Sequence, residues 1–284
     1  MADNKTGMDY TIDVLIFGSA PIPADVVYNG RYLQRQMTDN TFGMTLVRGE
    51  GRNILVDCGS NMDDPAKKAI YFDIYGATMA SPQEALASAG LTPEDITDVV
   101  VTHAHMDHMG GLELFPNAHF FVQKDELEGW EAVVANPKMG PALTPGVLDP
   151  GDLVRARELA AEGRMTLLEG DVENLLPGID VHVFPFAHSI SDQVVVIRTK
   201  SGNFVDVGDI STRAKGITGV DEAPYYMVQD GAAGSIYLSM MAFPKILEWA
   251  DNDIDHVILR HDVNYKDTRI QEFHEESVAR YSFC

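Results

Sequence analysis

The sequence contains little cysteine and few positive charges, and it has no long apolar run. Cys58 and Cys284 are its only cysteines, so no disulfide framework holds the fold together and a reducing compartment is expected. The 21 Lys and Arg residues are outnumbered by 43 Asp and Glu residues, which gives a net charge of −22. This balance argues against proteins that hold nucleic-acid phosphates or an anionic membrane surface with a basic face.

Transmembrane and targeting segments are also missing from the sequence. No stretch of about 18 apolar residues is present to cross a bilayer, and residues 1–9 lack the apolar core of a signal peptide. With 45% hydrophobic and 23% charged residues, the composition is that of a globular protein. No linker or internal repeat divides the chain. We therefore expect a cytoplasmic protein whose residues 1–284 form one domain, with neither nucleic acid nor membrane as a partner.

Apolar runs alternate with helix-start signals along the chain. The runs predict strands at 11–17, 41–47, 53–56, 98–102, 118–123, 166–168, 180–184, 193–199, 203–207 and 256–259. Helices are predicted at 81–90, 124–134, 153–162 and 242–251, and the first of them opens with the capping-box sequence Ser81-Pro82-Gln83-Glu84. Because strands and helices are interspersed, we predict an α/β sandwich of two packed mixed sheets with helices outside.

A dense cluster of metal-ligand side chains follows the apolar run 98–102. Four such residues stand within six positions: His103, His105, Asp107 and His108. Alternate residues of a strand share a face, so the first two histidines are expected side by side. If a helix begins after His105, the other two lie on its opening turn, and Gly110 and Gly111 allow close backbone packing behind them. The cluster predicts a metal site rather than a chance grouping on a solvated loop.

Three later residues fit the same purpose. His188, Asp209 and His261 each stand at or just beyond the end of a predicted strand. Sites in α/β sheets assemble at strand ends, so we expect these residues to join the cluster, although each alone has an equally good structural explanation. Imidazole and carboxylate ligands suit zinc, and iron, manganese or cobalt accept the same set.

The order His-x-His-x-Asp-His, lone His, Asp and final His resembles the metallo-β-lactamase superfamily of dinuclear metallohydrolases. Within it, the sequence is most similar to the N-acyl homoserine lactonase-like branch, through residues 117–126, Asp192 and the pair His261-Asp262. The resemblance implies an αββα sandwich that holds two divalent metal ions, expected to be Zn²⁺, at one edge of the sheets. It assigns His103, His105 and His188 to one ion and Asp107, His108 and His261 to the other, with Asp209 as the bridge.

The resemblance also implies hydrolysis. His105 stands where the flavin-linked di-iron oxidoreductases have glutamate, and Asp209 stands where some β-lactamases proper have cysteine. Two cations a few ångströms apart turn a bound water into a metal-bound hydroxide near neutral pH. By resemblance, Asp107 is in addition the proton donor to the leaving alkoxide. The expected substrate is a small-molecule lactone or similar cyclic ester.

Other functions fit the same ligands. A thioesterase of the glyoxalase II type and a phosphotriesterase are the enzymatic alternatives, and a metal-binding protein without turnover is a different class. The complete ligand set argues against the last of these, because degenerate members of the superfamily tend to lose ligands.

The sequence departs from the better-known lactonases at two positions. Those enzymes place a tyrosine shortly after the bridging aspartate, whereas Asp209 is followed by Ile210-Ser211-Thr212. The substrate carbonyl is then left to one of four donors: Ser211, Thr212, Tyr225 or Tyr226. Asp192 also replaces a histidine, and both differences indicate a substrate other than the usual long-chain signal molecule.

Two segments rich in aromatic residues and methionine, 25–42 and 224–243, are expected to shape the substrate pocket. The alternative is that their residues belong to the ordinary core or to the interface of a homodimer. Cys58 is close to the cluster in sequence but has no activating base beside it, so we do not expect it to act as a nucleophile.

Overall fold

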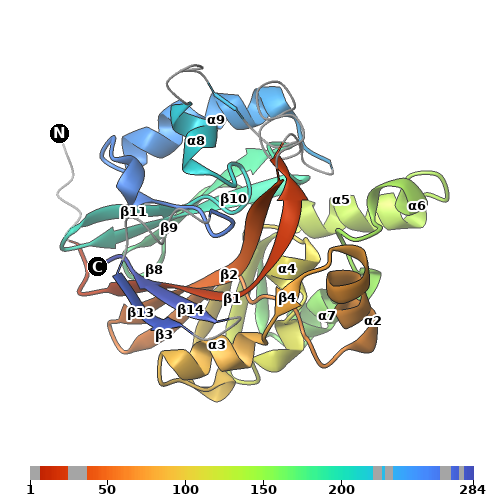
Figure 1. The fold of residues 1–284 in the computed structure, drawn as a ribbon, viewed down its shortest axis with the longest axis horizontal. Helices are drawn as coiled ribbons and strands as arrows, with labels where there is room; N and C mark the ends of the chain where they lie inside the picture. Colours follow the sequence, from red (N-terminus) through yellow and green to blue (C-terminus); the bar gives the residue numbers. More distant parts are fainter. Residues whose placement is uncertain (1–6, 25–36, 220–225, 228–232, 263–269, 275–277) are drawn as a thin grey trace.

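Two β-sheets lie face to face in the middle of the molecule, and helices cover their outer faces (Figure 1). The computed structural model describes residues 7–24, 37–219, 226–227, 233–262, 270–274 and 278–284. In Figure 1, α8 and α9 lie above the smaller sheet and α3 lies below the larger one. The layers are therefore helix, sheet, sheet and helix, as the αββα prediction requires.

The larger sheet joins both ends of the described chain. Within the described ranges it has nine strands in the order β13-β14-β1-β2-β3-β5-β6-β7, with β4 paired to β1. Its strands are β1 (Thr11–Pro23), β2 (Met37–Gly49), β3 (Arg52–Val56), β4 (Thr78–Met79), β5 (Asp98–Val100), β6 (His119–Gln123), β7 (Met165–Leu168), β13 (Ile270–His274) and β14 (Ala279–Ser282). Since β3, β5, β6 and β7 are parallel, the segments that follow them leave from one edge.

The smaller sheet provides the other side of that edge. Among the residues with described positions it has five strands in the order β12-β11-β10-β9-β8. They are β8 (Val172–Leu176), β9 (Ile179–Pro185), β10 (Ser191–Thr199), β11 (Gly202–Asp206) and β12 (Val257–Ile258). Because β11 and β12 are parallel, Asp209 and His261, each three residues beyond its strand, start from the same edge.

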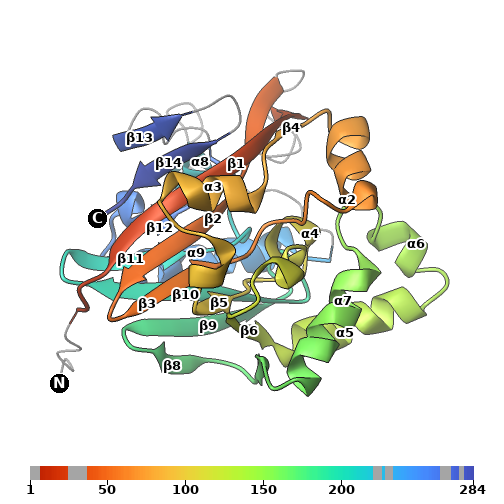
Figure 2. The ribbon, with the colours of Figure 1, turned by 90° about the horizontal axis from the view of Figure 1, so that it is seen from below.

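The helices form the two outer layers. They are α2 (Pro65–Ala69), α3 (Pro82–Ser88), α4 (Met106–Met109), α5 (Lys124–Ala135), α6 (Gly140–Leu143), α7 (Pro150–Ala161), α8 (Ala214–Thr218) and α9 (Ile236–Trp249). Figure 2 shows α2, α5, α6 and α7 gathered toward one end of the molecule. Within the part of the chain that is described, no helix has the length and apolar character needed to cross a membrane.

Strand β1 shows why the larger sheet is buried on both faces. Ile12, Val14 and Ile16 point into the core between the two sheets. The alternate residues Leu15 and Phe17 point into the second core, which lies under the outer helices. A sheet covered on both sides requires such continuous apolar runs, as the sequence shows at 11–17 and 98–101.

Most predicted elements are present, and the capping box is confirmed in detail. Ser81 Oγ accepts from the Glu84 amide at 3.2 Å, and the Glu84 carboxylate accepts from the Ser81 amide at 2.7 Å. The run 98–102 is shorter than predicted, because β5 ends at Val100. His103 and His105 therefore lie on a loop, so the strand alternation used to pair them does not apply.

Two predicted helices begin in the wrong place. The helix predicted at 242–251 is α9, which begins at Ile236 with Ser235 as its N-cap. Pro244 inside the helix disguised this earlier start, since proline normally marks a first turn. Helix α7 begins at Pro150 rather than at 153, with Asp149 capping the amide of Gly151. The short elements β4, β8, α2, α6 and α8 and the late strands β13 and β14 were not predicted.

Candidate metal centre

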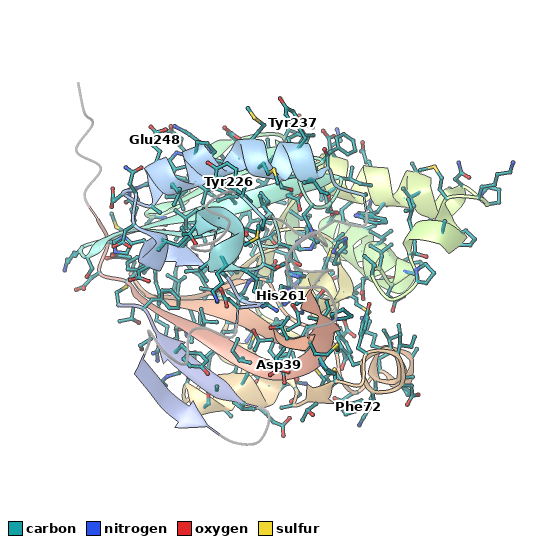
Figure 3. All side chains as sticks on the ribbon, turned by 45° about the horizontal axis from the view of Figure 1, so that its top comes forward. Asp39, Phe72, Tyr226, Tyr237, Glu248 and His261 are labelled. Carbon is teal, nitrogen blue, oxygen red and sulfur yellow. The ribbon has the colours of Figure 1, made fainter. Side chains whose placement is uncertain are left out.

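The seven predicted ligands lie together at the shared edge of the two sheets. His103 and His105 are on the loop after β5, and the next two ligands are on α4. His188 is in the turn between β9 and β10, while Asp209 and His261 follow β11 and β12. In Figure 3, His261 is labelled near the middle of the view and Phe72 and Tyr237 toward its edges; His261 is buried, whereas the other two are exposed. The site is thus built from both sheets.

A first group consists of His103, His105 and His188, whose candidate ligand atoms all lie within 4.8 Å of one another. His188 Nε2 is 3.1 Å from His105 Nδ1. Thr102 Oγ1 lies 3.0 Å from His103 Nδ1, and Nε2 of the same ring is buried without a hydrogen-bond partner among the described atoms. Three imidazoles therefore bring candidate ligand nitrogens close together.

A second group consists of Asp107, His108 and His261. Asp107 Oδ2 lies 3.3 Å from His108 Nε2 and 3.5 Å from His261 Nε2. The far nitrogen of each ring has its own partner: His108 Nδ1 is 2.7 Å from Asp57 Oδ2, and His261 Nδ1 is 2.5 Å from the Thr41 carbonyl oxygen. These partners accept the Nδ1 proton, so Nε2 of each ring is left as a metal ligand.

Asp209 lies between the two groups and offers one oxygen to each. Its Oδ1 is 3.0 Å from His261 Nε2 and 3.5 Å from His108 Nε2. Its Oδ2 is 3.5 Å from His188 Nε2. This is the arrangement expected of a carboxylate that bridges two cations.

The protonation states favour a metal at the first group and at the shared Asp209. Burial and neighbouring histidines hold the pKa values of His103 and His105 well below the usual range, so both rings are neutral. His261 and His108 outweigh burial and keep the pKa of Asp209 low. Neutral imidazoles and ionised carboxylates are the forms that bind metals. Buried polar atoms without partners are rare, so the unpartnered Nε2 atoms fit a site for divalent cations.

His108 behaves differently from the other rings. The carboxylates of Asp107, Asp209 and Asp57 surround it, outweigh the opposing effect of burial, and raise its pKa well above the usual value. Protonation of this ring would therefore compete with a metal ion for Nε2.

A buried ionic network lies directly behind the second group. Asp57 accepts from the Thr102 amide at 2.6 Å and pairs with Arg260 Nη1 at 2.6 Å. Arg260 also lies 3.4 Å from Asp206 Oδ1, and Asp206 accepts from Thr45 Oγ1 at 2.6 Å. Arg260 and His108 outweigh burial and lower the pKa of Asp57. Asp57 has a φ of 62°, an uncommon conformation for a residue other than glycine.

The two glycines after the motif are required by close backbone packing, as predicted. A Cβ on Gly110 would lie 2.2 Å from the Met106 carbonyl oxygen, and one on Gly111 would lie 2.3 Å from the Cys58 carbonyl oxygen. Cys58 itself is fully buried, its thiol donates to the His108 carbonyl at 3.3 Å, and burial raises its pKa well above the usual value. These properties agree with its exclusion as a nucleophile.

The centre opens into a cavity of about 330 Å³. Its wall combines candidate ligands with apolar and aromatic residues: Ala20, Pro21, Ile22, Asn40, Phe42, Tyr71, Tyr75, His105, Met106, Asp107, Gly146, Val147, His188, Asp209 and His261. Tyr71 and Tyr75 were not predicted to line it. Their spacing of four residues, which places them on one side of a helical turn, is the signal that was available.

None of the four predicted carbonyl donors lines the described wall of the cavity. Ser211 Oγ donates to the Arg213 carbonyl at 2.9 Å, and Thr212 is buried elsewhere. Tyr226 packs edge-to-face against Phe243, and Tyr225 lies outside the described residues. Ser211, Thr212 and Tyr226 thus do not line the described wall, and the identity of the carbonyl donor stays a prediction.

The two segments expected to shape the pocket have different outcomes. From 25–42, Asn40 and Phe42 line the cavity, while residues 25–36 lie outside the described part. From 224–243, no described residue lines it. Tyr237 and Met241 of that second segment are 68% and 60% exposed, and Phe243 is buried in the core between the sheets and α9. The described part of 224–243 is therefore outer helix and core.

Known proteins share this sequence in part. A family model described as the metallo-beta-lactamase superfamily matches residues 44–248, well over half of the chain. Metallo-beta-lactamase domain-containing protein 1 of Mus musculus is 34% identical over 96 residues, which cover 31% of this chain and 37% of that protein. N-acyl homoserine lactonase AiiB of Agrobacterium fabrum is 35% identical over 68 residues, which cover 24% of this chain and 25% of that protein. The alignments thus span about a third or less of these relatives' lengths.

The fold as a whole resembles that of a lactonase of known structure. AidC, described as a dizinc quorum-quenching lactonase in complex with the product N-hexanoyl-L-homoserine, aligns with a TM-score of 0.64 and 17% identity. The alignment covers 96% of this chain and 94% of AidC. At this level of identity the likeness establishes the αββα architecture.

Proposed function

The chain belongs to the metallo-beta-lactamase superfamily, and from that premise we propose that it is a dinuclear metal-dependent hydrolase that opens a lactone or a similar small cyclic ester. The observation behind this proposal is the position of Asp209, which offers one oxygen to each of two ligand groups at the base of a cavity. The proposal also treats residues 1–284 as one domain, because neither sheet supplies a complete ligand set.

The first group would hold one ion and the second group the other, with Asp209 shared. Imidazole nitrogens and carboxylate oxygens favour zinc, and the dizinc relative of the same fold supports this choice. When bound, such a pair of ions supplies Lewis acidity and makes a water molecule acidic near neutral pH. The chain's own residues must then orient the ester and move protons.

Asp107 is placed to move a proton during ring opening. It lines the cavity, and its side chain is 18% exposed, whereas that of Asp209 is 8% exposed. It can therefore face both the second group and a bound ester. We assign to its carboxylate the transfer of a proton from the attacking water to the leaving alkoxide, a role that contributes roughly 10²–10⁴-fold to such a step.

The cavity wall favours a neutral substrate with an apolar part. Phe42, Tyr71 and Tyr75 present aromatic surface next to the ligands. Tyr71 has its hydroxyl 2.8 Å from Ser60 Oγ, and Tyr75 donates to the Gly146 carbonyl at 2.5 Å, so both hydroxyls already have partners. Among the described wall residues there is no Lys or Arg to bind a carboxylate or phosphate. A small uncharged ester fits this environment.

A substrate panel tests this function. The zinc-loaded protein would be assayed on short-chain lactones, thioesters and aryl phosphotriesters, with chelator-treated protein as the control. We expect the largest kcat/KM with a lactone and loss of activity after chelation. A larger kcat/KM with a thioester or a phosphotriester would contradict the lactone assignment, and equal activity after chelation would contradict metal dependence.

A further inference from the structure

Glu126, on the first turn of α5, is a fully buried carboxylate that has no Lys or Arg partner in the described part of the chain. Four donors surround it instead. Its Oε1 accepts from the Ala104 amide at 2.9 Å, from Trp130 Nε1 at 3.0 Å and from Ser189 Oγ at 2.6 Å. Its Oε2 accepts from the Ser191 amide at 2.5 Å. A buried carboxylate with this many donors is a structural centre in its own right.

Three of the four donors belong to the two segments that hold the first group, and the fourth, Trp130, is on α5 itself. Ala104 stands between His103 and His105, on the loop that leaves the larger sheet after β5. Ser189 directly follows His188, in the turn that enters β10 of the smaller sheet. One side chain thus links the loops that contribute all three first-group ligands, although those loops come from different sheets.

A second carboxylate supports the same turn. Asp192 Oδ2 accepts from the His188 amide at 2.8 Å and from the Ser189 amide at 2.7 Å. Its contacts lie within one turn, so it can shape that turn but cannot fix its distance from the His103–His105 loop. Glu126 bonds to donors in both loops, and Gln193 of β10 adds to this link by donating to the Thr102 and Val101 carbonyls.

We propose that Glu126 is a positioning residue that fixes the spacing between His188 and the His103–His105 pair, and thereby sets the metal affinity of the first group but not of the second. This inference rests on the proposed function, because it presupposes a metal ion at the first group. Loss of an outer-shell partner typically weakens metal binding by about 10–100-fold. We expect that range for Glu126.

The chemistry of the side chain suggests a conservative variant. A carboxylate only accepts hydrogen bonds, whereas an amide presents an NH₂ group on one side. In Glu126→Gln that NH₂ would face either the Ser191 amide or the three donors at Oε1, so at least one donor loses its acceptor. The volume of the side chain is nearly unchanged. The matched control is Glu128→Gln, the same substitution at an exposed position of the same helix.

The experiment measures zinc affinity in backgrounds that leave one site intact. His261→Ala removes a second-group ligand, so the remaining high-affinity site is the first group. His188→Ala removes a first-group ligand and leaves the second group. Zinc dissociation constants would be obtained by competition with a chromophoric chelator. Adding Glu126→Gln should weaken zinc binding about 10–100-fold in the His261→Ala background. In the His188→Ala background, adding Glu126→Gln should change zinc affinity by less than about twofold. Glu128→Gln should change zinc affinity by less than about twofold in either background.

Two results would overturn the inference. An equal loss of affinity in both backgrounds would show that Glu126 only stabilises the fold, and unchanged affinity in the His261→Ala background would show that it does not position the first group. If instead the proposed function is wrong, the chain without any substitution will fail to bind two zinc ions. If Glu126→Gln does not fold, Ser189→Ala removes one donor to Oε1 and should produce a smaller loss with the same selectivity.

Discussion

The two ligand groups of the candidate metal centre are supported in different ways. In the first group, the neighbouring carboxylates of Glu126 and Asp192 bind backbone amides of the ligand loops. In the second group, Asp57 and the Thr41 carbonyl bind the ligand rings themselves, at Nδ1 of His108 and His261. The first group is therefore organised mainly through the positions of its loops, with one ring contact from Thr102 to His103, and the second through the orientation and tautomer of its rings.

This difference decides what a mutation behind each half should do. Removing a ring partner changes which nitrogen bears the proton while the backbone stays in place. Removing a loop partner leaves the rings unaltered but lets their backbone move. Asp209 contacts both groups, so its loss should weaken zinc binding at both of them rather than at one.

Asp209→Ala should have the largest effect on metal binding, because it removes the one carboxylate that faces both groups. We expect both zinc affinities to fall by more than the roughly 10–100-fold typical of an outer-shell residue, and activity to fall with them. Chelator competition measures both constants. Retention of one site at its original affinity would show that Asp209 belongs to one half and is not a bridge.

Asp107→Asn should lower the rate of catalysis much more than it weakens metal binding by the second group. The amide keeps the shape and one oxygen but cannot transfer a proton, so kcat for a lactone should fall by about two orders of magnitude while much of the metal is retained. The loss should be smaller for an aryl ester, whose leaving group needs less protonation. Equal fractional losses for both substrates would show that Asp107 is a ligand only.

Asp57→Asn should weaken the second group selectively. The variant loses an acceptor shared by His108, Thr102 and Arg260, so we expect zinc affinity at this group to fall about 10–100-fold. Affinity at the first group, measured in the His261→Ala background, should fall much less, because Asp57 reaches that group only through Thr102. Asp63→Asn, at an exposed site, is the control. A loss of similar size at the first group would mean that the two halves share one support.

Ser81→Ala should have the smallest effect and should leave the centre intact. It removes the N-cap of α3, a helix that packs on the far side of the larger sheet. The expected cost is about 0.5–2 kcal/mol in the free energy of unfolding, measured by urea denaturation. Zinc affinity and kcat should match those of the unmodified protein. A change in zinc affinity at either group would show that the outer helical layer influences the centre.

The sequence was sufficient to predict the fold and the convergence of the seven ligand-type residues for a physical reason. The residues that converge at the centre are concentrated in one dense motif or placed just after apolar strands, where α/β sheets build their sites. The capping box of α3 could also be predicted, because its two partners, Ser81 and Glu84, are only three residues apart.

The supports behind the ligands could not be predicted in this way. Glu126 lies in an ordinary helix start, and its role appears only when the turn before β10, 63–65 residues away in sequence, packs against it. Tyr71 and Tyr75 lie in a short helical segment with no strong sequence signal. The start of α9 was misplaced because Pro244 inside the helix obscured the N-cap Ser235, and β5 ends at Val100, before the apolar run does.

The zinc content of purified, zinc-loaded protein tests the central claim most directly. Elemental analysis would be applied to the unmodified chain and to the His188→Ala and His261→Ala variants, each after removal of loosely bound metal. The two groups with their shared aspartate predict two zinc ions in the first case and one in each variant. Fewer than two ions in fully active, unmodified protein would contradict a dinuclear centre shared through Asp209.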